Sequence, residues 1–313
     1  MKHRLKKIQD QVMVITGATS GIGLTTARRA AERGARVVLV ARNAEALGKI
    51  TAEMAQAGRE AAYVVADVAR MEDVRRIADF ARERFGGFDT WVNNAGISIF
   101  GRYEQVPLED QRRLFDTNFW GVVHGSLVAV EELRHRGGAI INLGSEVSDV
   151  AVPLQGMYSA SKHAVKGFTD SLRVEVEAAG DLISVTLIKP AAIDTLFVPH
   201  ARNYMDVEPK LPAPIYAPEV VADAIIYAAQ HPKRDIYAGG AAKLFSAGNR
   251  LMPRLIDKYL ERFMFRQQRT TRPVDRGEGA LYSPGADLKE RQGYEGHVCE
   301  SSFYTRLTTA FGR

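Results

Sequence analysis

Short apolar runs rich in valine, isoleucine and alanine alternate with longer amphipathic stretches along the first 240 residues. The apolar runs predict seven strands, the last with the weakest pattern, at 11–16, 36–41, 62–66, 90–93, 139–143, 184–188 and 235–237. The amphipathic stretches predict helices at 22–33, 44–57, 71–85, 108–134, 155–179 and 217–230. Continuous apolar strands that alternate with helices indicate a parallel sheet covered on both faces. The sequence therefore predicts an α/β fold with a Rossmann-type, doubly wound parallel sheet of about seven strands.

The pattern changes after Gly240. Residues 253–266 predict a basic amphipathic helix, with Pro253 in its first turn. Its apolar positions fall at helical spacing: Leu255, Ile256, Tyr259, Leu260 and Phe263. Its basic positions recur every four residues: Arg250, Arg254, Lys258, Arg262 and Arg266. From 267 onward the chain is rich in glycine, proline and serine and has little periodicity, so we expect an irregular or partly ordered tail. The chain is thus divided into a domain at 1–240 and a C-terminal extension at 241–313.

Composition narrows the function classes. The chain has 313 residues, 46% hydrophobic and 25% charged, which indicates a globular protein with a sizeable core. The net charge is +5, and residues 243–272 hold eight Lys/Arg against two acids, so the rest is nearly balanced. This distribution argues against a nucleic-acid binder. The chain has one cysteine, Cys299, and no apolar segment behind its basic first residues, so we expect a cytoplasmic protein.

A glycine-rich turn follows the first predicted strand, with the spacing Gly-x3-Gly-x-Gly. Gly17 permits a tight turn, Gly21 lets backbone approach a pyrophosphate, and Gly23 lets helix and strand pack closely. The free N–H groups at the start of the next helix would bind phosphate. A tight strand–helix turn without a ligand is the alternative. The preceding strand and the following helix favour dinucleotide binding.

The tip of the second predicted strand carries Arg42 and no acid. An acidic side chain there would accept hydrogen bonds from the ribose hydroxyls of NAD. A guanidinium instead matches a 2′-phosphate, so Arg42 favours NADP(H). The alternative is a surface arginine at a strand end.

A candidate catalytic pair lies in the predicted helix 155–179. Tyr158 and Lys162 are four residues apart and share a helix face. A nearby ammonium would favour the phenolate and make the tyrosine a usable general acid/base. Such a pair is common on helix surfaces, but here Ser145 and Asn94 follow neighbouring strands at the edge where open sheets bind ligands.

Taken together, these residues resemble the short-chain dehydrogenase/reductase superfamily over about residues 10–240. The resemblance is carried in order by the loop 16–23, Asp67-Val68, 93–96, Asn118, Ser145, Tyr158 with Lys162, and 190–195. It implies an NADP(H)-dependent oxidoreductase that interconverts a carbonyl compound, a lipophilic ketone or aldehyde, and an alcohol. It also implies a homodimer or homotetramer formed through the long helices that contain Asn118 and Tyr158.

The resemblance also implies residue roles. Tyr158 would be the general acid/base, Lys162 would bind the nicotinamide ribose and lower the tyrosine pKa, Ser145 would bond the substrate oxygen, and Asn118 would hold a water in a proton relay. The implied cofactor-binding residues are Gly17, Thr19, Ser20, Gly21, Ile22, Gly23, Arg42, Asp67, Val68, Asn94, Ala95, Gly96, Tyr158, Lys162, Pro190, Ile193 and Thr195. No metal is expected. Ser20 departs from the second basic residue that some NADP-dependent members carry, which leaves Arg42 alone in that role.

Several alternatives stay open. The protein could be a non-catalytic NADP-binding regulator, or a lipid reductase at a membrane surface. The helix 253–266 could pack on the protein itself, contact another subunit or lie on an anionic membrane. The tail could cover the substrate cleft or wrap a partner. By position, the residues that should border that cleft are Glu146, Val147, Met157, Ala192, Phe197 and 97–100, with Glu146 the polar exception.

Overall fold

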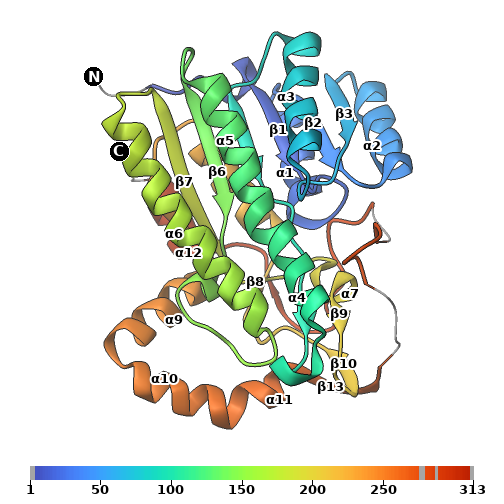
Figure 1. Ribbon diagram of the computed structural model, residues 1–313, viewed down its shortest axis with the longest axis vertical. Helices are drawn as coiled ribbons and strands as arrows, with labels where there is room; N and C mark the ends of the chain where they lie inside the picture. Colours follow the sequence, from blue (N-terminus) through green and yellow to red (C-terminus); the bar gives the residue numbers. More distant parts are fainter. Residues whose placement is uncertain (1–3, 275–278, 286–287, 311–313) are drawn as a thin grey trace.

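The computed structural model of the protein describes residues 4–274, 279–285 and 288–310. A central sheet of seven parallel strands has the order β12-β7-β6-β4-β1-β2-β3 (Figure 1). The strands are β1 Val12–Thr16, β2 Arg36–Ala41, β3 Ala61–Val65, β4 Thr90–Asn93, β6 Gly138–Leu143, β7 Ile183–Pro190 and β12 Asp235–Ala238. Each lies within two residues of a predicted run. The predicted doubly wound α/β fold is confirmed.

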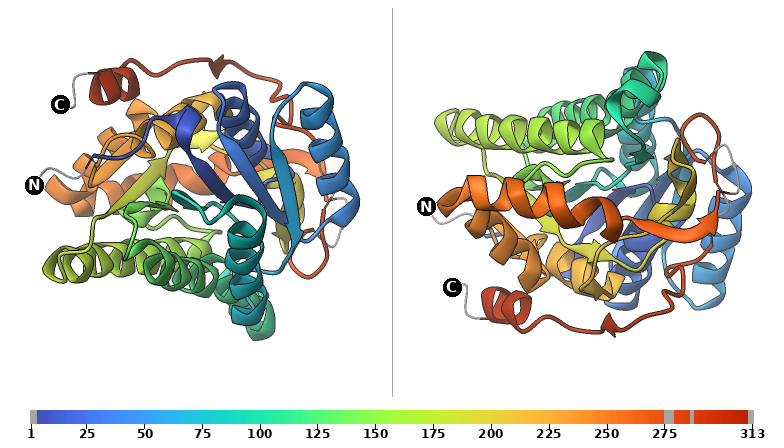
Figure 2. Two further views of the ribbon diagram at one scale, coloured as in Figure 1. Left: turned by 90° about the horizontal axis from the view of Figure 1, so that it is seen from above. Right: turned by 90° about the horizontal axis from the view of Figure 1, so that it is seen from below.

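Two helical layers cover the sheet, because alternate residues of each strand face opposite sides. Met13 and Ile15 pack in one apolar cluster with residues of α1, α2 and α8, whereas Val12 and Val14 pack in the other with α3, α5 and α6. Figure 2 shows these layers on either side of the strands. The helices are α1 Gly21–Glu32, α2 Ala44–Gln56, α3 Met71–Phe85, α4 Leu108–Phe115, α5 Gly121–Leu133, α6 Gly156–Ala178 and α8 Pro218–Ala228.

The strand order places the candidate site. From β1 the chain continues to β2 and β3 on one side of β1, and then returns to form β4 on the other side of β1. The direction in which strands are added reverses here, so β1 and β4 flank the switch point of the sheet. Loops at the carboxyl ends of strands around such a point form the ligand crevice of open α/β folds. The glycine turn after β1 and the residues after β4, β6 and β7 therefore meet at one edge.

The predicted helix at 108–134 is interrupted in its middle. One π-helical turn, Asp116–Trp120, separates α4 from α5 and contains Asn118. Such a turn inserts an extra residue and redirects the side chains within it, which a periodic pattern does not reveal. Asn118 is fully buried there.

The C-terminal extension is more ordered than we expected. An unpredicted helix, α9 Gly240–Leu251, precedes α10 Pro253–Tyr259, a π-helical segment η5 Leu260–Met264, and α11 Phe265–Gln267, which together cover the predicted helix. The tail is partly ordered and contains β13 Arg269–Pro273, β14 Val298–Cys299 and α12 Phe303–Ala310. These elements pack on α8, α9 and β12 and on loop strands, partners too distant in sequence to leave a local pattern.

Short elements tie the loops at the carboxyl edge together. The helical turns there are Tyr103–Gln105, Glu146–Ser148 and α7 Phe197–His200, whereas the turn Ile8–Asp10 lies before β1 at the opposite edge. The paired strands are β5 Ile99–Phe100 with β9 Arg202–Asn203, β10 Val207–Pro209 with β13, and β11 Ile215–Tyr216 with both β8 Ala192–Ile193 and β14.

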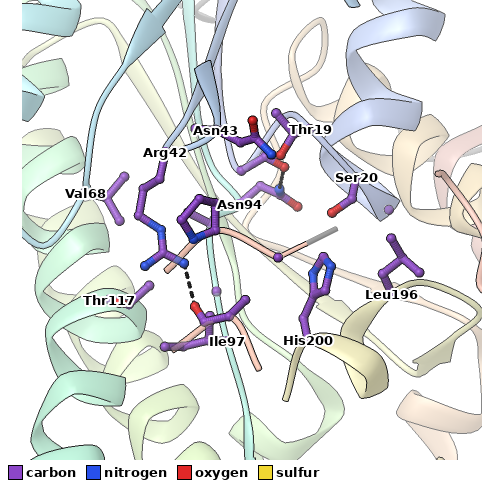
Figure 3. A pocket seen from close by; sticks show the side chains of 18 of the residues that line it. Thr19, Ser20, Arg42, Asn43, Val68, Asn94, Ile97, Thr117, Leu196 and His200 are labelled. Carbon is purple, nitrogen blue, oxygen red and sulfur yellow. Dashed lines mark hydrogen bonds between the residues drawn. The ribbon is translucent and has the colours of Figure 1, made fainter. Parts of the chain in front are cut away.

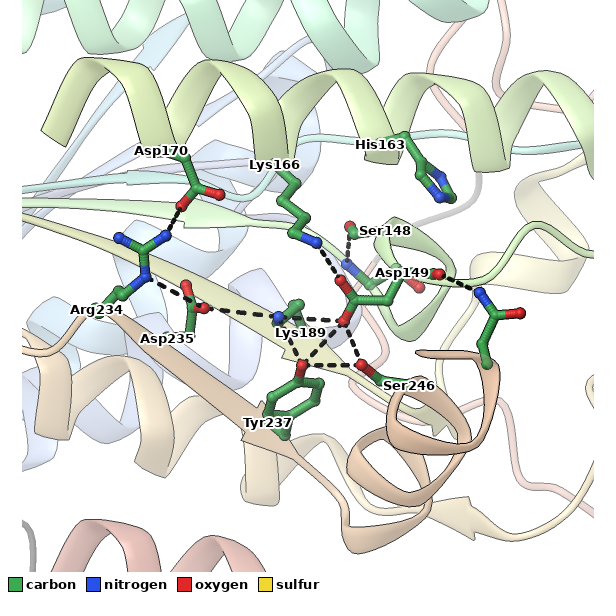
Figure 4. A network of polar contacts seen from close by, with 12 residues as sticks. Ser148, Asp149, His163, Lys166, Asp170, Lys189, Arg234, Asp235, Tyr237 and Ser246 are labelled. Carbon is green, nitrogen blue, oxygen red and sulfur yellow. Dashed lines mark hydrogen bonds and ion pairs between the residues drawn. The ribbon is translucent and has the colours of Figure 1, made fainter. Parts of the chain in front are cut away.

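A buried polar network attaches α9 to the sheet (Figure 4). The Asp149 carboxylate accepts hydrogen bonds from Lys166 of α6 at 2.6 Å, Lys189 of β7 at 3.2 Å, Tyr237 of β12 at 3.0 Å and Ser246 of α9 at 2.8 Å. Burial alone would raise the pKa of Asp149, but the ammonium groups of Lys166 and Lys189 and the Ser246 hydroxyl hold that pKa well below its usual range. Four elements thus converge on one carboxylate.

Candidate active site

Ser145, Tyr158 and Lys162 line one cavity of about 150 Å³ at the carboxyl edge of the sheet. Ser145 follows β6 and caps the turn Glu146–Ser148, where its Oγ accepts a hydrogen bond from the Val147 amide. Tyr158 and Lys162 lie one turn apart on α6. The Phe197 ring packs against the Tyr158 ring with centroids 5.2 Å apart. The three predicted catalytic side chains therefore meet in one place.

Burial controls the proton affinity of both titratable groups of this set. It raises the pKa of the Tyr158 phenol well above its ordinary value, against the opposing effect of its hydrogen bond to Ser145. It lowers the pKa of the Lys162 ammonium to about 8. Lys162 donates to the Leu143 carbonyl at 2.8 Å and lies 5.7 Å from the centre of the Tyr158 ring. In the chain itself the phenol is thus protonated at neutral pH, and burial outweighs the lowering that we expect from Lys162.

Asn118 lies behind this set. Its amide accepts from Ile97 N–H and donates to Ile97 C=O, both at 2.9 Å. A Cβ placed on Gly96 would lie 3.5 Å from Asn118 Oδ1 and 3.7 Å from Lys162 Nζ, so both side chains reach the same side of the Gly96 loop. The expected water relay between them stays a prediction.

A second cavity of about 190 Å³ adjoins the first, and Asn94, Gly96 and Thr195 line both. Figure 3 shows Arg42 and Val68 on one side of it and Ser20, Leu196 and His200 on the other. Most predicted cofactor-binding residues line it: Gly17, Thr19, Ser20, Gly21, Ile22, Arg42, Asp67, Val68, Asn94, Ala95, Gly96 and Thr195. Pro190 and Ile193 line the catalytic cavity instead.

The glycine turn fits a dinucleotide. A Cβ on Gly23 would lie 2.1 Å from the Gly17 carbonyl oxygen, so α1 can approach β1 this closely only with glycine at this position. Gly17 and Gly21 have φ values of 66° and 52°, which L side chains rarely adopt. The turn therefore brings backbone without side chains and the N-terminus of α1 to the cavity, an arrangement that suits a pyrophosphate; the Gly21 amide itself already donates to the Lys289 carbonyl at 3.0 Å.

Part of the tail forms the outer wall of this second cavity. We call residues 279–285 and 288–290 the C-terminal strap; its Ala280, Pro284 and Gly285 line the cavity. The Arg42 guanidinium donates to strap carbonyl oxygens at 2.5–3.3 Å, those of Ala280, Leu281, Tyr282 and Ser283. This part of the tail therefore borders the predicted nucleotide site and not the substrate cleft.

Backbone bonds and polar side chains attach the strap to the glycine turn and to α4. The Gly21 amide donates to the Lys289 carbonyl at 3.0 Å, and the Leu288 amide donates to the Thr19 carbonyl at 2.9 Å. Arg113 bridges Asp67 at 2.6 Å and the Leu281 carbonyl at 3.2 Å. Sequence reasoning missed these contacts, because a strap held mainly by its own backbone carries no periodic pattern.

The catalytic cavity has walls that the sequence predicted only in part. Glu146, Val147, Ala192 and Phe197 line it as predicted. Met157 instead packs with Ile97 and Ile99 in a separate apolar cluster. The residues that we missed come largely from the extension and the loops before it: Gln155, Leu211, Pro212, Phe245, Met264 and Gln268.

Glu146 is the unusual residue of the cavity. Burial raises the pKa of its carboxyl group to about 7. Within the described residues, its side chain has no hydrogen bond or ion pair to offset this burial. The cavity therefore contains a carboxyl group that titrates near neutral pH.

In the described part of the chain, no three His, Cys, Asp or Glu side chains are grouped closely enough to bind a metal ion. The same residues contain no helix with the length and apolar character needed to cross a bilayer.

Comparisons with known proteins agree with this geometry. Residues 11–205 match the family described as short chain dehydrogenase. The chain is 48% identical over 311 residues to the uncharacterized oxidoreductase YxnA of Bacillus subtilis (strain 168), covering 98% of this chain and 87% of the relative. It is similar to a short chain dehydrogenase/reductase from Burkholderia phymatum in complex with NAD, with a TM-score of 0.71, 26% identity and coverage of 82% and 97%. A short chain dehydrogenase from Burkholderia cenocepacia J2315 in complex with NADP has a TM-score of 0.69, 26% identity and coverage of 82% and 99%.

The raised pKa of Glu146 predicts a pH-dependent stability. The pKa of this carboxyl group is near 7 in the folded state and near 4.5 in the unfolded state. Its contribution to the free energy of unfolding is therefore complete below about pH 4.5 and is lost as the pH rises to about 7. Glu146→Gln imitates the protonated form. We expect the variant to match the wild type near pH 4.5 and to gain about 1–3 kcal/mol in free energy of unfolding above about pH 7.5.

Urea denaturation of both proteins across this pH range measures the difference. Glu261→Gln, which removes an exposed carboxylate from η5, is the matched control and should show no such trend. A stability difference for Glu146→Gln that does not change with pH would contradict the assigned pKa.

Proposed function

The chain belongs to the short-chain dehydrogenase family of oxidoreductases, and we propose that it is an NADP(H)-dependent enzyme that interconverts a lipophilic ketone or aldehyde and an alcohol. One observation carries the proposal. Ser145, Tyr158 and Lys162 line a cavity that shares Asn94, Gly96 and Thr195 with the nucleotide cavity. A substrate carbonyl beside Tyr158 would thus lie next to a bound dinucleotide.

Tyr158 transfers the proton in this proposal. In the reducing direction its buried phenol donates a proton to the carbonyl oxygen, and in the oxidising direction the phenolate accepts one from the alcohol. The raised pKa of the phenol keeps the proton in place until negative charge develops on the substrate oxygen. The Ser145 hydroxyl donates a second hydrogen bond to that oxygen as the charge develops.

Lys162 and Asn118 support this transfer. The Lys162 ammonium would bond the nicotinamide ribose, and Asn118 would hold a water that passes protons toward Lys162. When bound, the dinucleotide supplies or accepts the hydride. The residues proposed to hold it are the glycine turn 17–23, Arg42, Asp67-Val68, 94–96, and Pro190, Ile193 and Thr195.

Arg42 supports NADP(H) over NAD(H). Its guanidinium borders the nucleotide cavity at the tip of β2, where no acid competes for the ribose hydroxyls. Four strap carbonyls already accept hydrogen bonds from the same guanidinium, so a 2′-phosphate would bind it by replacing some of these acceptors. One of the two solved relatives is a complex with NAD and the other a complex with NADP. The comparisons therefore do not distinguish the two cofactors, and the proposed preference for NADP(H) depends on Arg42.

We further propose that residues 1–240 form the nucleotide-binding and catalytic domain, that 241–313 complete its cavities, and that the protein is cytoplasmic. A homodimer or homotetramer through the long helices is supported by exposed apolar side chains on the π-helical turn 116–120, α5 and α6: Trp120, Leu127 and Val174.

A second candidate function is a reductase that works at an anionic membrane surface. Leu255, Tyr259 and Phe263 of the predicted amphipathic helix are 59%, 37% and 45% exposed, so much of its apolar stripe is not packed on the protein. Leu251 and Met252 extend this exposed apolar surface between α9 and α10. The accompanying basic residues would attract anionic lipid headgroups. The remaining alternative, a non-catalytic regulator, is disfavoured because cofactor binding alone does not need a tyrosine acid.

Tyr158→Phe should abolish turnover while leaving NADPH binding largely intact. Removing the phenolic proton eliminates the general acid, which is worth about 10²–10⁴-fold in kcat. NADPH oxidation against a panel of ketones and aldehydes gives the rate, and fluorescence titration gives the cofactor Kd. Tyr63→Phe, at an exposed tyrosine on β3, is the control and should behave as wild type. Retained turnover in Tyr158→Phe would refute the assigned acid.

Arg42→Ala should weaken NADPH binding about 10–100-fold and NADH binding much less, because only NADPH has the 2′-phosphate that pairs with the guanidinium. Calorimetric titration with each cofactor measures both affinities. Arg33→Ala, at an exposed arginine just after α1, should change neither. Equal losses for the two cofactors would mean that Arg42 serves the strap and not the phosphate.

The membrane alternative predicts salt-sensitive binding to anionic liposomes. Co-sedimentation with vesicles that contain phosphatidylserine should capture the wild-type protein, and Arg254→Glu with Lys258→Glu should prevent capture by reversing charge on α10. Vesicles of phosphatidylcholine alone are the control. No sedimentation of the wild type at low salt would exclude this candidate.

A further inference from the structure

A side cavity of about 440 Å³ extends the catalytic cavity toward the extension. Five residues line both cavities, so the two spaces adjoin: Glu146, Ala192, Pro212, Phe245 and Met264. The other walls of the side cavity are mainly apolar and come from the loop 213–214, from α9 and from α10: Ala213, Pro214, Ala241, Leu244, Gly248 and Ile256. The space available to a substrate is therefore elongated and mainly apolar.

Two hydrogen-bond acceptors in these walls have no donor. The half-buried Glu146 side chain lines both cavities where they adjoin, and within the described chain no hydrogen bond or opposite charge acts on its carboxyl group. Gln268 lines the catalytic cavity and is fully buried; its Nε2 donates to the Pro153 carbonyl at 2.8 Å, while its Oε1 has no partner within the described residues. Gln268 Oε1 is thus a fully buried acceptor without a partner, a kind of group that destabilises a protein and is rare.

Other polar groups of these walls are already paired. Gln155 Nε2 donates to Ser98 Oγ at 3.0 Å, and the Tyr259 hydroxyl bonds the Gln267 amide at 3.0–3.1 Å. The acceptors at Glu146 and Gln268 thus differ from their neighbours, and a ligand that enters the cavity must supply the missing donors.

We propose that the substrate is an elongated lipophilic carbonyl compound or alcohol with an additional hydrogen-bond donor, which Glu146 and Gln268 accept while its apolar part fills the side cavity. The donor is a hydroxyl group or a protonated amine. This inference rests on the proposed function and names the substrate class of the same site. A site built to bond a donor rejects analogues that lack it, since the acceptors would then stay buried without partners.

The test uses the full chain with NADPH and a matched set of long-chain methyl ketones. One ketone is unsubstituted, and the others carry a hydroxyl or an amino group at successive chain positions. We expect the wild type to favour at least one donor-bearing ketone over the unsubstituted one by about tenfold or more in kcat/KM. In Glu146→Leu this ratio should fall about 10–100-fold, and in Gln268→Leu by a smaller factor.

Glu146→Gln separates the two donor types. An amide oxygen still accepts from a hydroxyl but lacks the charge that pairs with an ammonium, so the variant should keep preference for a hydroxy-ketone and lose it for an amino-ketone. Glu261→Gln on η5 is the matched control and should keep every ratio. Gly248→Leu would fill part of the side cavity and should lower kcat/KM for long ketones relative to short ones.

Two results would overturn the inference: wild type with no preference for any donor-bearing ketone, or Glu146→Leu with an unchanged ratio. Failure of the proposed function looks different, because then no ketone is turned over at all. In that case calorimetric binding of the matched alcohols still tests the inference. Equal affinity for substituted and unsubstituted alcohols, or no effect of Glu146→Leu on that difference, would overturn it without reference to turnover.

Discussion

The buried ammonium of Lys189 constrains much of the structure around the site. It lies on β7 with only 2% of its side chain exposed, and an unpaired charge at such a position would strongly destabilise the fold. Asp235 of the adjacent β12 supplies one countercharge at 3.7 Å, and Asp149, in the loop after Ser145, supplies a closer one at 3.2 Å. The same carboxylate bonds α6 and α9, so one ion pair positions the helix of Tyr158 and one wall of the side cavity together.

The interaction of Asp149 with Ser246 explains why residues of the C-terminal extension line the substrate site. α9 is attached through Ser246, and its Phe245 then lines both the catalytic cavity and the side cavity. Leu260 and Met264 pack on Val147 and Val150 beside Ser145, while Leu255 and Phe263 of the same helical segment stay exposed. Some apolar residues of the predicted amphipathic helix thus pack in a core cluster and others lie at the surface. The π-helical turn η5 inserts an extra residue, which changes the direction of the side chains that follow it.

The sequence predicted those parts of the site whose chemistry or local pattern leaves a signal. Strands came from apolar runs, and Ser145, Tyr158 and Arg42 came from residue type at the ends of strands or on a helix face. α9 and the strap could not be predicted in this way. α9 contains three glycines or serines in its sequence and depends on a contact with Asp149 across nearly one hundred residues. The strap is held by backbone carbonyls, which every residue carries, so its sequence contains no mark of where it binds.

Desolvation links the chemistry of the site to the molecules it would bind. Burial raises the pKa of Tyr158 and Glu146 and lowers that of Lys162, so in the chain alone all three groups are displaced toward their neutral forms. A dry cavity also strengthens any charge or hydrogen bond that a ligand brings into it. A cofactor ribose that accepts a hydrogen bond from Lys162, and a substrate donor beside Glu146, would each restore part of the stabilisation of the charged form that these groups lose on burial. Lys162 and Tyr158 already have protein partners, so the missing partners are those of Glu146 and of Gln268 Oε1. Ligands that supply donors to these two groups are therefore favoured, which is the physical basis for selectivity at this site.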